Sequence, residues 1–273
     1  MKKILLIKHG SLGDIVFSLP VMYSIFKHYS NSKIDLLTEK KYFSFLNFSQ
    51  YFDEILEDNR SSNIFITLSL LLKITKKKYD LIIDLQNSSR TKYYNLFFRL
   101  LSNSKISSSR NFSHFKYAIP NQGFETATQG LFNQIKIIGI NKILDVTYPW
   151  LEKDIDQKYN KFVLMIPGVS KSGHYKQWDP LKFAKLARYI ENRKYKICII
   201  GTNSDKFSVD PIINCCVNLI NNIGNSPPKI IYSIAKKSNL IISNDTGPGH
   251  IASLSMNNML WITNDNNVTK ANI

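Results

Sequence analysis

Short, continuous runs of Ile and Leu alternate with helix-like segments along most of this chain. Continuous apolar runs are typical of parallel strands, because helices cover both faces of such a sheet. Strands that alternate with helices predict a doubly wound α/β fold. In the first half we expect strands at Lys3–Lys8, Lys33–Thr38, Phe52–Glu57 and Tyr79–Leu85, and helices near 14–29, 42–48, 64–76 and 91–101.

A polar stretch, YPWLEKDIDQKYN (Tyr148–Asn160), interrupts this alternation, which then resumes. We therefore expect a domain at 1–150, a linker at 151–160 and a second domain at 161–273. Two consecutive α/β domains with a hinge imply a cleft, and ligands of such sheets bind beyond the carboxyl ends of strands. The second set of expected strands is 161–168, 195–202, 216–222, 240–245 and 259–263, with helices at 180–193, 227–237 and 248–255.

The formal charge of +16, from 36 basic and 20 acidic residues, favours anionic partners such as nucleic acid, acidic lipid or phosphorylated sugars. The alternative is a solvated basic surface that reflects a Lys-rich composition. A nucleic-acid partner is not expected, because the chain carries no recognisable reader motif. Three cysteines without metal-like spacing fit a reduced, cytoplasmic protein.

Two apolar segments, one at the start of the chain and one later, could in principle insert into or contact a membrane. The N-terminal apolar run is too short for a signal peptide. The segment IFITLSLLLKI (Ile64–Ile74) is about half a bilayer span in length. We expect an amphipathic helix packed on a sheet, with contact to a membrane surface as the alternative.

The stretch KHGSLGDIVFSLP (Lys8–Pro20) follows the first expected strand. It lacks both the G-x-G-x-x-G and the G-K-[ST] pattern of nucleotide-binding loops. Gly10 and Gly13 permit a tight turn into a helix, and Asp14 falls at the N-cap or in the first turn. Asp14 is either a capping residue or a carboxylate exposed at the cleft that accepts a proton.

Anion-binding groups follow strands of the second domain. The loop PGVSKSGHYKQW contains Ser170 and Lys176, whose hydroxyl and ammonium groups suit a diphosphate, although a solvated basic loop is the alternative. In NDTGPGHIAS, Thr246 and Gly247 open an expected helix whose free amides attract anions, and His250 lies one turn inside.

Two aspartates of this domain have different expected roles. Asp245 would repel a phosphate, so we assign it to holding its loop, while Asp205 could accept hydrogen bonds from ribose hydroxyls. No cluster of acids and histidines suggests a divalent metal, and NDNN (264–267) is too rich in amides for one. We expect neither a metal nor another cofactor.

Four segments, in order, resemble glycosyltransferase family 9, the bacterial lipopolysaccharide heptosyltransferases, which have the two-domain GT-B fold. These segments are KHGSLGDIVFSLP, YDLIIDLQNSSRT, PGVSKSGHYKQW and SNDTGPGHIAS. The resemblance implies inverting, metal-independent transfer of heptose from ADP-heptose to a lipopolysaccharide inner-core acceptor of the lipid A–Kdo type. It also implies an enzyme in the cytoplasm, peripheral to the inner membrane.

The resemblance also implies roles for individual residues. Asp14 is the general base, and Gly10, Ser11 and Gly13 form a loop that the acceptor approaches. Ser170, Lys176, Thr246, Gly247 and His250 belong to the donor diphosphate site, and Asp245 positions their loop. Asp205 stands where the family has a glutamate that binds the nucleoside. Family members continue beyond the last strand, so the C-terminal domain is expected to be shortened; a catalytically silent nucleotide-sugar-binding protein is the alternative.

Overall fold

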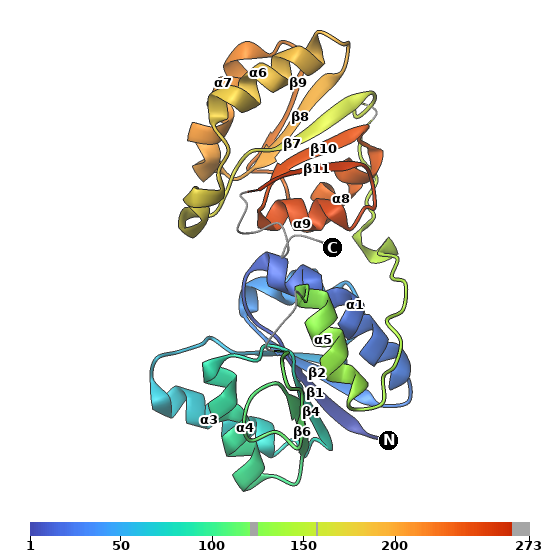
Figure 1. Ribbon diagram of the computed structural model, residues 1–273, viewed down its shortest axis with the longest axis vertical. Helices are drawn as coiled ribbons and strands as arrows, with labels where there is room; N and C mark the ends of the chain where they lie inside the picture. The colour runs from blue at the N-terminus through green and yellow to red at the C-terminus, as the bar shows by residue number, and fades with distance from the viewer. Residues whose placement is uncertain (121–124, 157, 264–273) are drawn as a thin grey trace. The chain divides into compact units, whose positions relative to one another are not determined.

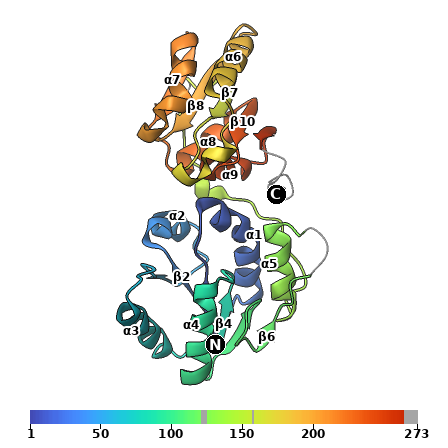
Figure 2. The same cartoon turned by 60° about the vertical axis from the view of Figure 1, so that its left-hand side comes forward.

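The computed structural model describes residues 1–120, 125–156 and 158–263 of the chain. These residues form two compact units that divide between Thr147 and Tyr148, and each unit is a layered α/β structure (Figures 1 and 2). The doubly wound architecture expected from the alternating pattern is therefore confirmed.

The first unit contains a parallel sheet with the strand order β3-β2-β1-β4-β5-β6. The central strand β1 pairs with β2 on one side and with β4 on the other. The strand order therefore reverses at the β1–β4 pair, which makes this pair the topological switch point of the sheet. The strands are β1 (Lys3–Ile7), β2 (Lys33–Thr38), β3 (Glu54–Glu57), β4 (Leu81–Asp84), β5 (Lys105–Ser108) and β6 (Phe115–Lys116).

Helices cover both faces of this sheet (Figure 1). On one face, Leu5 and Ile7 of β1 form a core cluster with side chains from two helices, α3 (Ile64–Thr75) and α4 (Ser89–Leu101). Side chains alternate along a strand, so the equally buried Ile4 and Leu6 point to the opposite face. There α1 (Leu12–His28) packs against α5 (Ala127–Lys136). A short helix, α2 (Phe43–Asn47), follows the 3-10 turn η1 (Lys40–Tyr42).

The second unit repeats the same topology with the order β11-β10-β7-β8-β9. Its switch point is the β7–β10 pair. The strands are β7 (Phe162–Ile166), β8 (Lys196–Gly201), β9 (Leu219–Ile223), β10 (Leu240–Asn244) and β11 (Met259–Ile262). The helices are α6 (Pro180–Glu191), α7 (Lys206–Cys215), α8 (Pro228–Lys237) and α9 (Gly247–Ser253), with the 3-10 segments η2 (Pro149–Leu151), η3 (Lys171–Lys176) and η4 (Asn203–Asp205).

Several elements differ from the sequence-based expectation. β9 begins at Leu219 rather than at Cys216, and α5, α7, β5 and β6 were not predicted. β5 reads KISS and α7 contains Pro211, so neither has the apolar or helical pattern that sequence rules recognise. Within the stretch interpreted as a linker, the Lys153 amide donates to Ser233 Oγ on α8 at 2.8 Å.

The helices of the structure can be compared with the length that a bilayer span requires. Across the described part of the chain, no helix combines the length and the apolar character that a bilayer span requires.

Candidate functional sites of the two units

The turn between β1 and α1 holds Asp14 in a capping box. Ser11 is the N-cap residue of α1, and its Oγ accepts a hydrogen bond from the Asp14 amide at 3.3 Å. In return, Asp14 Oδ2 accepts the Ser11 amide at 2.7 Å and the Ser11 hydroxyl at 2.8 Å. Asp14 Oδ1 makes no hydrogen bond to the residues that the structure describes, and the side chain is exposed. Asp14 can therefore cap helix α1 through Oδ2 while Oδ1 remains available for chemistry.

Gly10 is required by this arrangement. Its φ of +111° lies in the region that favours glycine. A Cβ atom at Gly10 would lie 2.6 Å from Asp14 Oδ2, which is closer than any normal contact. The predicted tight turn therefore depends on Gly10, whereas Gly13 is a buried residue inside the first turn of α1.

Hydrogen bonds from neighbouring strand ends fix the turn at the switch point of the first sheet. Lys8 Nζ donates to the Leu85 carbonyl at 3.3 Å, and the His9 amide donates to Gln86 Oε1 at 3.0 Å. Both partners follow β4, the neighbour of β1. Tyr42 OH adds a hydrogen bond of 2.7 Å to the Gly10 carbonyl. Asp14 is thereby positioned at the edge where parallel sheets bind their ligands.

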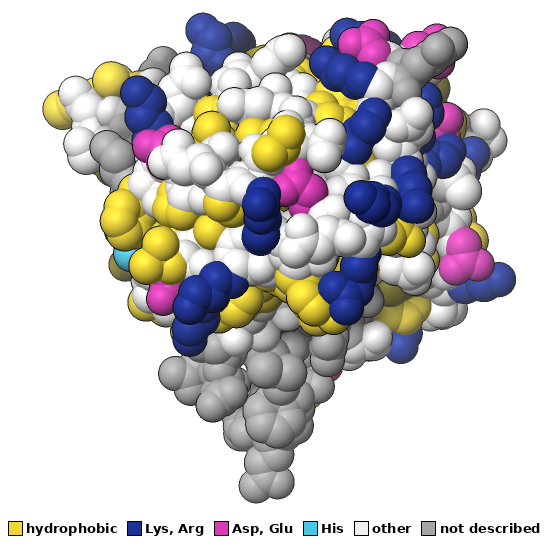
Figure 3. Space-filling model, turned by 90° about the horizontal axis from the view of Figure 1, so that it is seen from above, with side chains coloured by type: hydrophobic (Ala, Val, Ile, Leu, Met, Phe, Trp, Pro, Cys, Tyr) yellow, Lys and Arg dark blue, Asp and Glu magenta, His cyan; other side chains and the backbone are white. Residues whose placement is uncertain are grey.

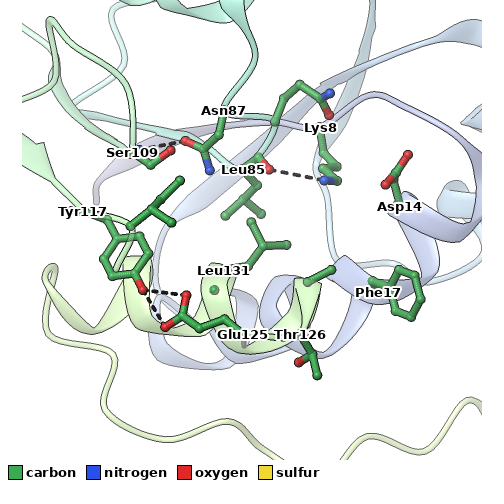
Figure 4. Close-up of a pocket in the computed structure, with 14 residues that line it drawn as sticks. Lys8, Asp14, Phe17, Leu85, Asn87, Ser109, Tyr117, Glu125, Thr126 and Leu131 are labelled. Atoms are coloured by element: carbon green, nitrogen blue, oxygen red, sulfur yellow. Dashed lines mark hydrogen bonds between the residues drawn. The ribbon is translucent and has the colours of Figure 1, made fainter. Parts of the chain in front are cut away.

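A cavity of about 290 Å³ opens beside Asp14 (Figure 4). Lys8 and Asp14 lie on one side of it, and the Tyr117 hydroxyl, bonded to both oxygens of Glu125, lies on the other. Burial lowers the pKa of Lys8, although the carboxylates of Asp14 and Asp84 oppose that shift. A cavity with these groups can receive a polar ligand that offers hydroxyls.

Asn87 and Ser109 also line the cavity, and Ser109 gives it unused hydrogen-bonding capacity. Asn87 adopts a φ of +52° and binds the Ser109 amide with its Oδ1 at 2.7 Å. Ser109 Oγ is buried and has no hydrogen-bond partner within the described part of the chain. A buried polar atom without a partner costs free energy, which a ligand hydroxyl could recover. Sequence reasoning missed Lys8, Asn87, Ser109, Tyr117 and Glu125 as site residues, since their strands or turns meet only in the fold.

In the second unit, the side chains of Lys176 and His250 both contact Asp245. Lys176 Nζ donates to Asp245 Oδ2 at 2.7 Å, and His250 Nε2 lies 3.1 Å from Asp245 Oδ1. These contacts, led by the hydrogen bond from His250, lower the pKa of Asp245 to about 2. Asp245 thus connects the loop after β10 to the end of η3 and to α9.

Hydrogen bonds at the β7–β10 switch point hold the loops that contain Lys176 and Asp245. Asn244, the last residue of β10, donates from Nδ2 to the Pro167 carbonyl at 2.7 Å and accepts the Trp178 amide at 3.2 Å. The loop after β7 is thereby fixed to the end of β10. Ser170 is the N-cap of η3, and Thr246 is the N-cap of α9, whose first residue is Gly247.

Asp205 has the same local structure as Asp14. Thr202 donates to Asp205 Oδ2 from its amide at 2.7 Å and from its hydroxyl at 2.8 Å, which forms a capping box. The carboxylate lies so close to the loop after β7 that a Cβ atom on Gly168 would be 2.6 Å from Asp205 Oδ1. The structure therefore brings Asp205 to the carboxyl edge of the second sheet, near the loop that contains Ser170.

Among the described residues, the acids, cysteines and histidines form no group of three or more that could hold a metal ion. The NDNN stretch lies outside the described residues.

We expect Gly10→Ala to disturb Asp14 directly. The substitution combines backbone strain with a collision against Oδ2, so it should destabilise the protein by about 1–3 kcal/mol and reduce any Asp14-dependent activity. Gly139→Ala is a matched control, because Gly139 has a φ of +92° but no atom within 4 Å of its Cβ position. Denaturant unfolding and activity assays should separate the two variants. Equal loss of activity in both would contradict the proposed role of Gly10.

Asp245 should make stability depend on pH. Its pKa of about 2 lies below the ordinary 3.8, so its contribution is complete above about pH 4 and declines as the pH falls toward 2. Because the carboxylate is only half-buried, solvent screening reduces its full contribution to about 1 kcal/mol. Denaturant unfolding at a series of pH values should show wild type more stable than Asp245→Asn at neutral pH, with a gap that narrows below pH 4. A gap that stays constant or widens on acidification would contradict this account.

Comparison with known proteins finds similar proteins for most of the chain. Residues 142–257 match the model of glycosyltransferase family 9 (heptosyltransferase). The chain is also 23% identical over 274 aligned positions to lipopolysaccharide heptosyltransferase 3 of Escherichia coli, covering 88% of this chain and 77% of that protein.

Solved structures share the fold over nearly the whole chain. A family 9 glycosyltransferase from Veillonella parvula superposes with a TM-score of 0.76 at 17% identity, covering 95% of this chain and 80% of that one. The E. coli heptosyltransferase WaaC, solved with ADP-2-deoxy-2-fluoro heptose, gives a TM-score of 0.75 at 13% identity, with coverages of 95% and 88%. The chain therefore has the GT-B fold and is a glycosyltransferase that resembles the heptosyltransferases of family 9.

Proposed function

We propose that this glycosyltransferase moves heptose from ADP-heptose to an inner-core lipopolysaccharide acceptor of the lipid A–Kdo type, with inversion at the anomeric carbon and without a metal. The observation that carries the proposal is the position of Asp14, which lines the cavity of the first unit with Oδ1 available. The E. coli relatives are named as a lipopolysaccharide heptosyltransferase and as a heptosyltransferase solved with an ADP-heptose analogue, which supports the donor and acceptor classes.

Asp14 acts as the general base in this proposal. An acceptor hydroxyl in the cavity attacks the anomeric carbon, its proton passes to Asp14 Oδ1, and the bond from that carbon to the diphosphate oxygen breaks. The carboxylate lies in the first turn of α1, at the carboxyl edge of the first sheet. The Gly10–Gly13 turn, with Ser11, leaves room for the acceptor beside it.

The second unit binds the donor in this proposal. The leaving ADP gains negative charge, which the Lys176 ammonium stabilises without transferring a proton. Because Asp245 already holds that ammonium and His250 in place, the cation needs no reorganisation when the donor binds. Ser170, Thr246 and Gly247 supply hydroxyl and amide donors to the diphosphate, and Asp205 accepts hydrogen bonds from the nucleoside ribose.

The proposed location is the cytoplasm, with peripheral contact to the cytoplasmic face of the inner membrane. The formal charge of +16 supports an anionic acceptor and an anionic membrane surface. The second candidate function, a nucleotide-sugar-binding protein without transferase activity, requires the donor groups of the second unit and makes no use of Asp14.

The two capping-box aspartates provide a matched pair of variants. Asp14→Asn and Asp205→Asn each replace a capping carboxylate by an amide that can still accept the cap hydrogen bonds, so their effects on stability should be similar. We expect Asp14→Asn to lower kcat by about 10²–10⁴-fold while donor affinity is retained. We expect Asp205→Asn to weaken donor binding with a much smaller change in kcat. Transfer assays with a deacylated core acceptor and calorimetry with the donor measure both effects.

The outcomes of that pair separate the candidate functions. Transfer that survives in Asp14→Asn would exclude Asp14 as the base. Donor binding by wild type without transfer to any core acceptor would favour the silent binding protein.

Lys176→Gln should weaken donor binding through loss of its positive charge. The test is a thermal-shift comparison of ADP-heptose, ADP, UDP and UDP-sugars. We expect ADP-heptose and ADP to raise the melting temperature of wild type, UDP and UDP-sugars to leave it unchanged, and the variant to show a smaller rise. Lys182→Gln, an exposed lysine of α6, is the control and should leave the shift unchanged. A larger shift with UDP-sugars would contradict the donor class.

A further inference from the structure

The outward face of α3 is apolar where a surface helix is normally polar. The inner residues Leu71 and Ile74 belong to the core of the first unit. Phe65, Leu68 and Leu72 recur at helical spacing on the opposite side and are exposed; Phe65 is 77% accessible. The sequence pattern correctly predicted a helix packed on the sheet, but not an outer face that remains apolar in the folded unit.

The same outward stripe becomes basic toward the end of the helix. Lys73 and Lys76 follow on the exposed side, and neither forms an ion pair with a residue that the structure describes. Their neighbour Lys77 pairs with Glu54 at 2.5 Å. No acidic residue occurs between Asp58 and Asp80, so nothing within the helix offsets this charge.

Helix α4 extends the surface beside α3. The two helices pack against each other on one face of the sheet, as both views of the fold show (Figures 1 and 2). Tyr93, Leu100 and Leu101 are exposed on α4. Residues 59–120 contain eleven Lys and Arg but only two acids, of which Asp84 is fully buried and Asp80 accepts the Lys3 amide at 2.7 Å.

We propose that this α3–α4 surface, formed by the exposed apolar and basic residues of the two helices, docks on an anionic lipid bilayer. Phe65, Leu68 and Leu72 insert at the boundary between headgroups and acyl chains, and Lys73 and Lys76 bind lipid phosphates. An in-plane helix with an apolar stripe and basic flanks has the properties of peripheral membrane anchors. The proposal deepens the membrane contact of the proposed function by naming the surface responsible.

Charge complementarity selects a bilayer over a second copy of the chain. A symmetric dimer through this surface would bring the same basic excess from each copy into one interface. Like charges brought together in this way repel, whereas an anionic membrane attracts each of them. A protein partner would need an acidic rim around an apolar groove that matches both helices.

The α3–α4 surface begins at the edge of the sheet where Asp14 lies. Arg90 of α4 donates to the carbonyls of Arg60 and Ser61, the residues just before α3. Arg60 also lies 3.5 Å from Glu39 Oε1, the atom that accepts the Gly10 amide at 3.4 Å. A bilayer on this surface would therefore present a lipid-anchored acceptor at the Asp14 edge; only this consequence rests on the proposed function.

The second unit offers matched controls because it also carries an excess of basic residues. Figure 3, which looks onto that unit, shows Lys and Arg side chains scattered among apolar ones. Phe207 has the same 77% accessibility as Phe65, and Leu181 is also exposed. Lys182 and Lys185 of α6 are exposed like Lys73 and Lys76. Controls at these positions change hydrophobicity and charge by the same amounts outside the α3–α4 surface.

The test is flotation of the full chain with vesicles of phosphatidylcholine, with and without phosphatidylglycerol. We expect wild type to bind the anionic vesicles, with binding that weakens as salt rises, and to bind neutral vesicles poorly. Phe65→Gln/Leu72→Gln and Lys73→Gln/Lys76→Gln should each reduce binding by about tenfold or more. Phe207→Gln/Leu181→Gln and Lys182→Gln/Lys185→Gln should stay within about twofold of wild type.

Several results would contradict the proposal that the α3–α4 surface docks on a bilayer. These are the absence of wild-type binding to anionic vesicles, an equal loss in the controls, or a dimer in solution that the α3 substitutions dissociate. Unchanged unfolding midpoints will show that the exposed substitutions leave the fold intact. Failure of the proposed function is distinguishable, because it would appear as lost transfer to a soluble, deacylated acceptor while vesicle binding persists.

Discussion

The reversal of strand order at one pair of strands in each sheet is the constraint on which the candidate site depends. At β1–β4 and at β7–β10, the connections leave in opposite directions, so the loops at the carboxyl edge separate and leave space for a ligand. Hydrogen bonds from Lys8 to Leu85 and from Asn244 to Pro167 join the two loops at each point. The first switch point carries a carboxylate beside a cavity, and the second carries a lysine and a histidine held by an aspartate.

The chain uses one local motif twice, and its surroundings decide what each copy can do. Asp14 and Asp205 both close capping boxes. Each also lies against a glycine, Gly10 or Gly168, where an added Cβ atom would collide with the carboxylate. Asp14 faces a cavity that Lys8 and Ser109 also line, whereas Asp205 lies beside the loop after β7. A capping role and a functional role are therefore not alternatives, since the cap uses Oδ2 and leaves Oδ1 of Asp14 available.

Sequence rules recovered the parts of this molecule that local patterns encode. The continuous runs of β1, β4 and β7 and the turn at Gly10 are visible without coordinates, because burial on both faces and a positive φ limit the residues that can occupy them. The cavity was not predictable, since Lys8, Asn87, Tyr117 and Glu125 come from four separate segments. Likewise, the apolar pattern of 64–75 predicted helix α3 but could not reveal that Phe65 and Leu72 stay exposed.

The central claim is that Asp14 takes the proton from an acceptor that lies in the cavity of the first unit. The most direct measurement is the distance from Asp14 Oδ1 to the reacting acceptor hydroxyl in a crystal structure with ADP and a deacylated core acceptor. The account predicts a separation of about 2.6–3.2 Å, with the saccharide beside Ser109 and Asn87. An acceptor bound outside that cavity, or a reacting hydroxyl hydrogen-bonded to a different base, would contradict it.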